Sequence, residues 1–220
     1  MKKIHPEWKP LIAHLFKDPR WKKMQKIISK TEFYPRAEDI FSALSISPND
    51  VKAVIIGMSP EKTDSYVGYA FGTDGRNTNS LRVIHDALWY QYNDITVDKD
   101  SFDNTMLSWV NQGVLLLNAS LTVPKVGARD AHVKYWKWFM TGLLSSIAHK
   151  NIPTALVGYA ARQLEVGHTR VINTCHPLKT YSEFYKKSCN YNRLDYNNNF
   201  LKHRMFLWFD KENCNIKWIN

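Results

Sequence analysis

Hydrophobic residues fall into short unbroken runs that alternate with stretches in which they recur every three or four positions. Four runs, rich in β-branched residues or leucine, cover residues 51–57, 113–119, 154–158 and 170–175. Runs of this length are typical of strands buried on both faces of a parallel sheet. The stretches between them have helical spacing, as in Leu81, Ile84 and Leu88 and in Val133, Trp136, Met140, Leu143, Leu144 and Ile147. The alternation predicts an α/β fold, a three-layer α/β/α arrangement around a central four-stranded parallel sheet.

The remaining segments flank this sheet. Residues 8–30 predict helix with a break near Pro19, and residues 197–211 predict a final basic helix. Residues 186–199, rich in Asn, Tyr and Lys, predict an insertion loop. A chain of 220 residues that is 44% hydrophobic can bury a real core, so we expect a single domain over residues 1–220.

The charge and the cysteines restrict the class of protein. The formal net charge is +10, with the excess at the two ends, which suggests a polyanionic partner, although a basic surface alone can also serve solubility. Cys175, Cys189 and Cys214 lack the spacing of a zinc site or a disulfide framework, so we expect a reducing compartment and no metal site. We also expect no cofactor. No apolar run near the start is long enough for a signal peptide or a membrane span. We therefore expect a soluble intracellular protein of the cytoplasm or nucleus, with no membrane partner.

Polar and small residues follow each predicted strand. In an open parallel sheet, ligands bind beyond the carboxyl ends of the strands, where loops converge and helix N-termini point their N–H groups at the ligand. The candidate site therefore consists of residues 57–60, Asn118, residues 158–159 and residues 176–177. A dinucleotide site is the obvious alternative, but neither GMSPEK nor GYAFGTDG provides Gly-x-Gly-x-x-Gly between a strand and a helix.

Several motifs in order resemble family 1 uracil-DNA glycosylases, from about Trp8 to Trp218. VKAVIIGMSP with GYAFGT is similar to the family's water-activating motif and its uracil-stacking Phe, and NSLRVI is similar to its serine-leucine phosphate loop. WVNQGVLLLNASLTV and ALVGYAAR resemble the base-reading strand and the next strand. CHP resembles the start of the histidine-bearing intercalation loop, and IKW resembles the family's ending. The resemblance implies an enzyme that removes a base flipped out of DNA.

The resemblance also implies roles for individual residues. Phe71 would stack on the flipped ring beside Met58, and Asn118 would pair with the base through an amide that offers donor and acceptor together. His176 would donate to the carbonyl oxygen on which negative charge develops during cleavage. Each has a plain structural alternative, namely a core phenylalanine, a strand-end turn residue and a structural histidine.

A second set would contact the DNA strand. Ser80, in a loop that leads into a helix, would hold a phosphate. His132 is similar to a family histidine near the DNA, although polarity at a helix start explains it equally well. After His176 and Pro177 the family has Ser-Pro-Leu, whose leucine fills the gap left by the flipped base. This chain continues with Leu178, Lys179, Thr180 and Tyr181, so either Leu178 or Tyr181 would be the wedge beside Lys179.

The water-activating motif departs from the family. Where the family has Gly-Gln-Asp-Pro-Tyr-His, this chain has Gly57, Met58, Ser59, Pro60, Glu61 and Lys62. Serine cannot set a negative charge beside a developing sugar cation, so we expect slow excision or none unless Glu61 substitutes for the acid. The alternative for Glu61 and Lys62 is a solvated ion pair. Loss of the motif's Tyr, which excludes C5-substituted pyrimidines, would leave space for a modified base.

Two functions remain open from the sequence. One is a uracil-DNA-glycosylase-like protein that binds single- or double-stranded DNA and accommodates a flipped pyrimidine, with base excision altered or weakened. The other is a non-enzymatic relative, a DNA-binding or protein-interaction module such as a replication accessory or a decoy for glycosylase inhibitors. Retention of Phe71, Asn118 and His176 favours continued base binding, because a purely structural role gives no reason to keep all three.

Overall fold

The computed structural model describes residues 4–92, 102–177 and 205–219. Its central sheet has four parallel strands in the order β3-β2-β5-β6: β2 (Ala53–Gly57), β3 (Val114–Asn118), β5 (Thr154–Val157) and β6 (Val171–Thr174). Every residue of β2, β3 and β5 is buried, whereas β6 is partly exposed at the edge of the sheet. Each strand lies within one of the four hydrophobic runs, so the predicted sheet is confirmed.

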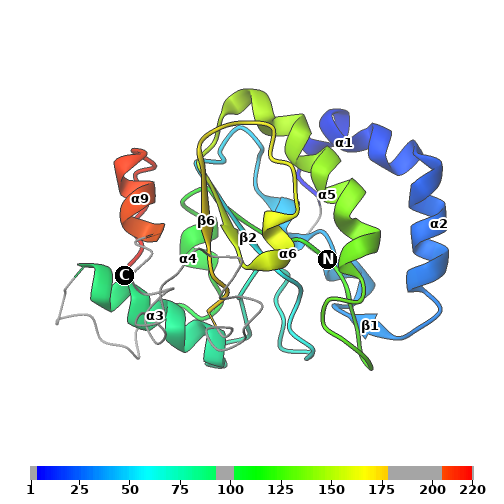
Figure 1. Ribbon diagram of the computed structural model, residues 1–220, viewed down its shortest axis with the longest axis horizontal. Coiled ribbons are helices and arrows are strands. Elements are labelled where there is room, and N and C mark those ends of the chain that lie inside the picture. Colours follow the sequence, from blue (N-terminus) through cyan, green and yellow to red (C-terminus); the bar gives the residue numbers. More distant parts are fainter. Residues whose placement is uncertain (1–3, 93–101, 178–204, 220) are drawn as a thin grey trace.

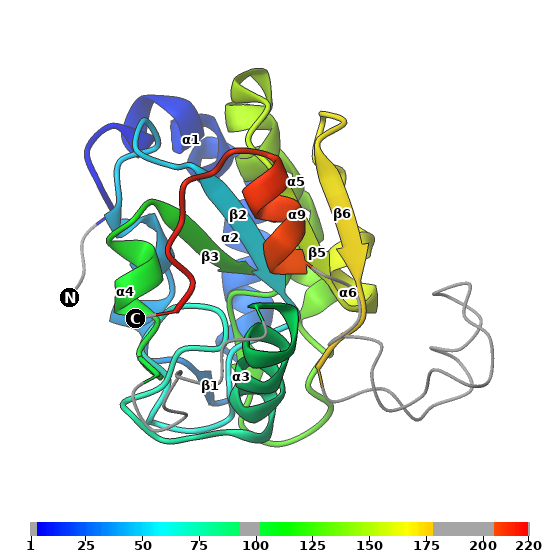
Figure 2. The same cartoon turned by 90° about the vertical axis from the view of Figure 1, so that its left-hand side faces the viewer.

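Helices cover both faces of this sheet, as Figure 1 and Figure 2 show. One face carries α1 (Trp8–Lys17), α2 (Pro19–Ile28) and α5 (Val133–Ile147), and the other carries α3 (Asn79–Tyr92) and α9 (Met205–Lys211). The short helices α4 (Leu107–Val110) and α6 (Tyr159–Arg162) lie against β3 and β5, and 3-10 turns occupy Ala37–Asp39, Ser42–Ser45 and Ala148–Lys150. The three-layer α/β/α architecture is therefore confirmed.

The predicted break near Pro19 separates α1 from α2. Asp18 adopts an extended conformation there, and its side chain accepts a hydrogen bond of 2.8 Å from the Arg20 backbone N–H. Pro19 is the first residue of α2, a position at which the missing N–H of proline costs nothing. The two short helices therefore meet at a bend, with α1 packed along α5, as Figure 1 shows.

Aromatic clusters fix the two helical layers on the sheet. On the α1–α5 face, Phe16, Trp21, Phe41, Trp136 and Phe139 have ring centroids within about 5–6 Å of one another, mostly in edge-to-face or tilted arrangements. On the other face a similar cluster joins α4 to α9 and the C-terminal segment: Trp109, Phe206, Phe209 and Trp218. These contacts hold the strands rigidly and so fix the positions of the loops that follow them.

A second, two-stranded sheet was not predicted. It pairs β1 (Phe33–Tyr34) with β4 (Val123–Pro124) in antiparallel orientation, extended by a 2.9 Å bond from the Lys125 N–H to the Glu32 carbonyl. Two-residue strands carry too short a pattern for sequence periodicity to detect. This pairing anchors the start of the loop that leads into α5.

The sequence also predicted an insertion loop and a final helix near the C-terminus, and no membrane span. The predicted insertion loop at residues 186–199 lies outside the described residues, while the predicted final helix is present from Met205 to Lys211. Within the described segments, no helix combines the length and the apolar character needed to cross a bilayer.

Candidate functional site

The carboxyl ends of the four strands lie at one edge of the sheet, and their register brings the first two ends side by side. Gly57 of β2 is paired with Asn118 of β3, and Val157 of β5 is paired with Thr174 of β6. A Cβ atom at Gly57 would lie 2.7 Å from Asn118 Oδ1 and 3.3 Å from Phe71 Cζ. Glycine is therefore the residue that leaves room for the Asn118 amide and the Phe71 ring together.

His176 lies at the same edge. It follows β6, and a Cβ atom at Gly158, the residue after β5, would lie 3.0 Å from His176 Cβ. The ring centroids of His176 and Phe71 are 6.4 Å apart, with an angle of 51° between their planes. Phe71, Asn118 and His176 thus gather around two glycines at the strand ends, with each side chain contributed by a different loop or strand.

Phe71 is held in an unusual backbone conformation. Its φ angle is +67°, in the left-handed region that bulky residues rarely occupy. Such strain persists only where the surroundings over-determine it. Here an isolated β-bridge between Tyr66 and Thr73 closes the loop, and the Ala70 N–H donates to the Leu116 carbonyl of β3 at 3.2 Å. The Phe71 ring is therefore positioned before any ligand arrives.

Asn118 is almost fully buried, at 3% exposure, and its amide has a side-chain partner that the sequence did not indicate. Asn118 Nδ2 donates to the Tyr66 hydroxyl at 3.2 Å. Burial raises the pKa of the Tyr66 phenol, outweighing the opposing effect of the bond from Asn118, so the hydroxyl stays protonated at neutral pH. The contact joins residues 52 positions apart, so it depends on the path of the 66–73 loop. The sequence carries no signal for such a contact.

The loop after β2 begins as a continuation of the ladder, since the Ser120 N–H donates to the Met58 carbonyl at 3.0 Å. Met58 and Ser59 are half-buried, and Pro60 is buried. The Ser59 hydroxyl oxygen is shielded from solvent and has no hydrogen-bond partner among the residues that the structure describes. A buried hydroxyl without a partner costs about 1–3 kcal/mol, so its presence beside Met58 calls for a functional explanation.

Glu61 and Lys62 do not pair with each other. The Glu61 carboxylate forms a 2.9 Å ion pair with Arg129, and Lys62 Nζ donates to the Gly127 carbonyl at 2.6 Å. Both contacts tie the loop after β2 to the loop before α5. For Glu61 to serve as a substitute acid, the ion pair with Arg129 would have to break.

His132 is buried at 5% exposure directly before α5. Its Nδ1 is 3.0 Å from Thr122 Oγ1, which also accepts a 2.7 Å bond from Trp136 Nε1. The Thr122 hydroxyl can both donate and accept, so the roles in its contact with His132 Nδ1 depend on the tautomer of the histidine. Burial lowers the pKa of His132, which favours the neutral imidazole. The histidine links the start of α5 to the residue before β4.

Ser80 is the second residue of α3 and is 3% exposed. Thr78 caps this helix, with its Oγ1 accepting a hydrogen bond from the Leu81 N–H at 3.3 Å. Pro177 is buried at the limit of the second described segment. Leu178, Lys179 and Tyr181 lie outside the described residues, so the identity of the wedge stays a prediction.

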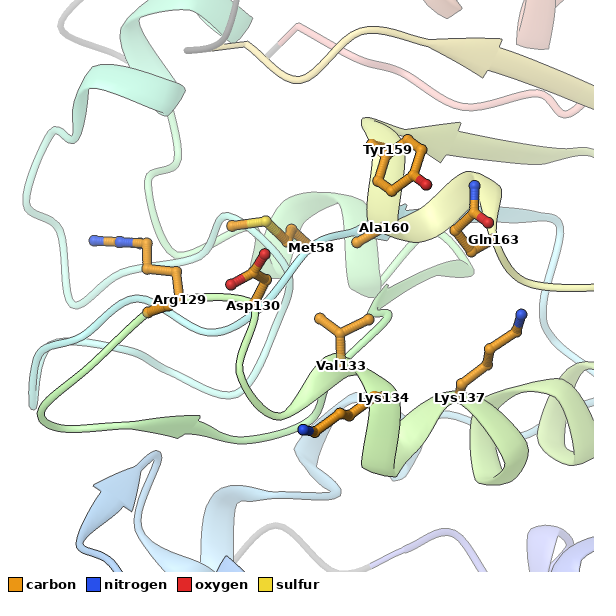
Figure 3. A pocket seen from close by; sticks show the side chains of 10 residues that line it. Met58, Arg129, Asp130, Val133, Lys134, Lys137, Tyr159, Ala160 and Gln163 are labelled. Carbon is orange, nitrogen blue, oxygen red and sulfur yellow. The ribbon is translucent and has the colours of Figure 1, made fainter. Parts of the chain in front are cut away.

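A groove opens beside the strand ends, between α5 and α6 (Figure 3). Its volume is about 570 Å³, and it extends from Met58 and Tyr159 along the first turns of α5. Figure 3 shows the Asp130 carboxylate turned toward Met58, and Tyr159 standing above Ala160 on the opposite wall. Lys134 and Lys137 are exposed and also line a second hollow of about 530 Å³ on the far side of α5, together with His14, Arg20 and Trp138.

Ligands for a metal ion are not assembled in this region. Across residues 4–92, 102–177 and 205–219, no three His, Cys, Asp or Glu side chains gather closely enough to hold one. The chemistry available at the strand ends is therefore that of an aromatic face, a buried amide, an imidazole and hydroxyl groups. This set suits recognition of a flat, polar ring.

Comparison with known sequences gives consistent relatives, although no protein-family profile matches the chain. Uracil-DNA glycosylase from Mycoplasma genitalium is 33% identical over 161 residues, which cover 70% of this chain and 65% of that protein. The Saccharomyces cerevisiae uracil-DNA glycosylase is 35% identical over 145 residues, covering 62% and 40%. The Idiomarina loihiensis uracil-DNA glycosylase is 30% identical over 150 residues, covering 64% and 68%. The match thus spans less than two thirds of the first two relatives.

Solved structures share the fold. The crystal structure of mimivirus uracil-DNA glycosylase superimposes with a TM-score of 0.68 at 17% identity, covering 80% of this chain and 70% of that one. UNG from Nitratifractor salsuginis gives 0.66 at 19% identity, covering 98% and 94%. A variant of the mimivirus protein in complex with UGI gives 0.68 at 17% identity, covering 81% and 72%.

Proposed function

This chain belongs to the uracil-DNA glycosylase family, and from that membership we propose that it binds DNA and accommodates a pyrimidine flipped out of the strand. We propose further that hydrolysis of the N-glycosidic bond is weakened, or altered in specificity, because Ser59 occupies the place of the family's Asp. The observation that supports base binding is the gathering of Phe71, Asn118 and His176 around Gly57 and Gly158.

The three side chains divide the work of recognising a pyrimidine. Phe71, fixed at a φ of +67°, offers a flat apolar face on which the ring stacks. The Asn118 amide accepts a hydrogen bond from the base N3–H and donates one to the O4 carbonyl. Because Asn118 is buried, a base that leaves this amide without partners would bind less favourably. His176 donates to the other carbonyl oxygen as electrons of the breaking bond move onto the base. Such fixed donors act in the transition state without reorganisation.

Ser59 accounts for the weakened cleavage. As the glycosidic bond breaks, the sugar gains positive charge, and a carboxylate at this position would stabilise that charge. The serine hydroxyl is neutral and, among the described residues, has no group that would polarise it. Glu61 is the nearest acid along the loop, but Arg129 neutralises its carboxylate at 2.9 Å. The altered specificity rests on the same segment, because Glu61 stands where the family's C5-blocking Tyr would be.

We place the DNA strand along the groove of Figure 3. Lys134 and Lys137 supply positive charge for phosphates, and Tyr159, which is 39% exposed, offers a ring on which a neighbouring base can stack. The first turn of α3, which contains Ser80, supplies backbone N–H groups for a phosphate on the other side of the flipped nucleotide.

The direct test is excision from single-stranded oligonucleotides that carry uracil, thymine or a 5-substituted uracil, read as alkali-labile sites. We expect slow release that is lost in Asn118→Ala and His176→Ala. The matched controls Asn111→Ala and His149→Ala change exposed residues that precede β3 and β5, away from the carboxyl ends of those strands, and retain it. Equal release by all four variants would refute the assignment.

A second function is favoured by Ser59 itself. If the missing carboxylate abolishes cleavage, the conserved fold serves as a DNA-binding module or as a decoy for a glycosylase inhibitor of the UGI kind, which a variant of mimivirus UNG binds. This alternative predicts that the protein binds uracil-containing DNA, or UGI, and produces no alkali-labile sites on any substrate. Titration of the protein with labelled UGI distinguishes a decoy, which binds UGI, from a DNA-binding module, which does not.

A further inference from the structure

Tyr66 contacts the base-reading amide directly, although nothing in the motif pattern points to it. Its hydroxyl accepts the hydrogen bond from Asn118 Nδ2 at 3.2 Å, and among the described residues this is the only hydrogen-bond partner of that hydroxyl. The side chain is partly buried, and its phenol stays protonated. Tyr66 therefore keeps one unused O–H donor beside the amide that would read the base.

The direction of this bond locates Tyr66 relative to a bound pyrimidine. An amide that pairs with N3–H and O4 uses Oδ1 and the Nδ2 hydrogen next to it. The second Nδ2 hydrogen then points along the pairing edge past O4, toward the C5 side of the ring. The Nδ2–Tyr66 bond uses this second hydrogen when the first is left for O4, and in that arrangement the Tyr66 hydroxyl stands beyond O4, on the side where C5 substituents project.

The loop geometry keeps Tyr66 in that position. The bridge between Tyr66 and Thr73 closes the loop that carries Phe71, and the Thr73 N–H is bonded to the Asn104 carbonyl at 2.8 Å. Tyr66 and Phe71 are therefore held by the same closed loop. The Phe71 ring, on which the base would stack, and the Tyr66 hydroxyl, on the C5 side of the base, are therefore fixed relative to each other.

We propose that Tyr66 positions the Asn118 amide and forms the wall on the C5 side of the base, so that it decides which pyrimidines enter. This inference rests on the proposed base-binding function. It assigns to Tyr66 the selection that the sequence alone attributed to position 61, because the Glu61 carboxylate is engaged by Arg129. The hydroxyl would donate to a polar C5 substituent, such as the oxygen of a hydroxymethyl group, and would oppose a methyl group.

The test measures binding to oligonucleotides that differ at one nucleotide: uracil, thymine, 5-hydroxymethyluracil or an abasic analogue. A fluorine at sugar C2′ slows cleavage, so that equilibrium anisotropy can be read whether or not the protein is active. Tyr66→Phe keeps the ring and removes the hydroxyl. We expect the preference for uracil over the abasic analogue to fall roughly 2- to 12-fold, the equivalent of one hydrogen bond. The preference for 5-hydroxymethyluracil over thymine should fall as well.

The matched control is Tyr69→Phe, which removes a phenol of the same loop whose hydroxyl is 3.4 Å from Ser45 Oγ. It should leave both base preferences unchanged. In an Asn118→Ala background, Tyr66→Phe should have no further effect on the uracil preference, because a positioning residue acts through the amide. A purely structural role would instead weaken binding of all four oligonucleotides equally.

Tyr66→Ala tests the wall. Removal of the ring should raise thymine binding relative to uracil, with thermal unfolding used to confirm that the variant is folded. If Tyr66→Phe and Tyr69→Phe give the same base preferences while Asn118→Ala abolishes them, the inference about Tyr66 fails and the base-binding function stands. If Asn118→Ala also leaves the preferences intact, the base-binding function fails first.

Discussion

Replacing Ser59 by aspartate should convert this protein into a faster glycosylase. Ser59 lies two residues beyond Gly57, whose neighbours are the Asn118 amide and the Phe71 ring, so a carboxylate there would stand beside the sugar of a bound nucleotide. A unit negative charge about 4 Å from the developing cation, at an effective dielectric constant of about 20, contributes about 4 kcal/mol. That corresponds to roughly a thousand-fold in the rate of bond cleavage.

The same substitution should make stability and activity respond to pH in opposite directions. The Ser59 hydroxyl oxygen is buried and, within the described part of the chain, has no partner, so burial would raise the pKa of an aspartate at this position. The rate gain requires the carboxylate and should disappear on acidification. The folded state would hold its proton at a pH where the unfolded chain has lost it, so the variant should be less stable than wild type at pH 8 and recover toward pH 5.

The assay is single-turnover release of uracil at pH 8 and pH 5, with urea unfolding at both. Ser59→Asn is the matched control, because it has nearly the same shape as aspartate and no charge. Cleavage by Ser59→Asp no faster than by Ser59→Asn at pH 8, with both variants folded, would refute the electrostatic account of the serine.

Two further predictions concern the groove and α5. The double variant Lys134→Gln with Lys137→Gln should make the dependence of single-stranded DNA affinity on log salt shallower by roughly 1.4, because each phosphate contact contributes about 0.7. The control double variant Lys22→Gln with Lys26→Gln, at exposed positions of α2, should leave the salt dependence unchanged. The same salt dependence in both double variants would show that the DNA does not follow the groove. The wild type should lose stability as pH falls below about 6.5, because burial lowers the pKa of folded His132 and the unfolded chain takes up the proton first. His132→Asn should flatten that loss in urea unfolding at pH 7 and pH 5, and an unchanged loss would contradict the neutral buried state.

The sheet was predictable because its signal is local. Each of the four strands is a hydrophobic run buried on one or both faces, and their parallel direction follows from the helical stretches between them. Because ligands bind beyond the carboxyl ends of parallel strands, the positions of the strand ends were enough to predict that Gly57, Asn118 and Gly158 belong to the site. The break at Pro19 was equally local, since proline and the Asp18 cap act on their immediate neighbours.

What the sequence could not supply are contacts set by loop paths. The bond between Tyr66 and Asn118 depends on the bridge that closes the 66–73 loop, and the ion pair between Glu61 and Arg129 joins loops that meet only in the folded chain. A pattern-based interpretation of Glu61 as a free acid or a solvated partner of Lys62 has no access to either contact. The pairing of β1 with β4 was missed for the same reason, because two-residue strands have no periodicity.

The bridge between Tyr66 and Thr73 makes the loop between them a self-contained cassette. Its ends meet each other, and inside it the buried residues Tyr69 and Ala70 belong to the core, so a replacement that keeps these two residues leaves the path of the chain into and out of the loop unchanged. Exchange of this one segment between relatives would move the stacking ring and the edge-contacting phenol as a unit onto an unchanged sheet. New base preferences could then arise by replacement of a single loop.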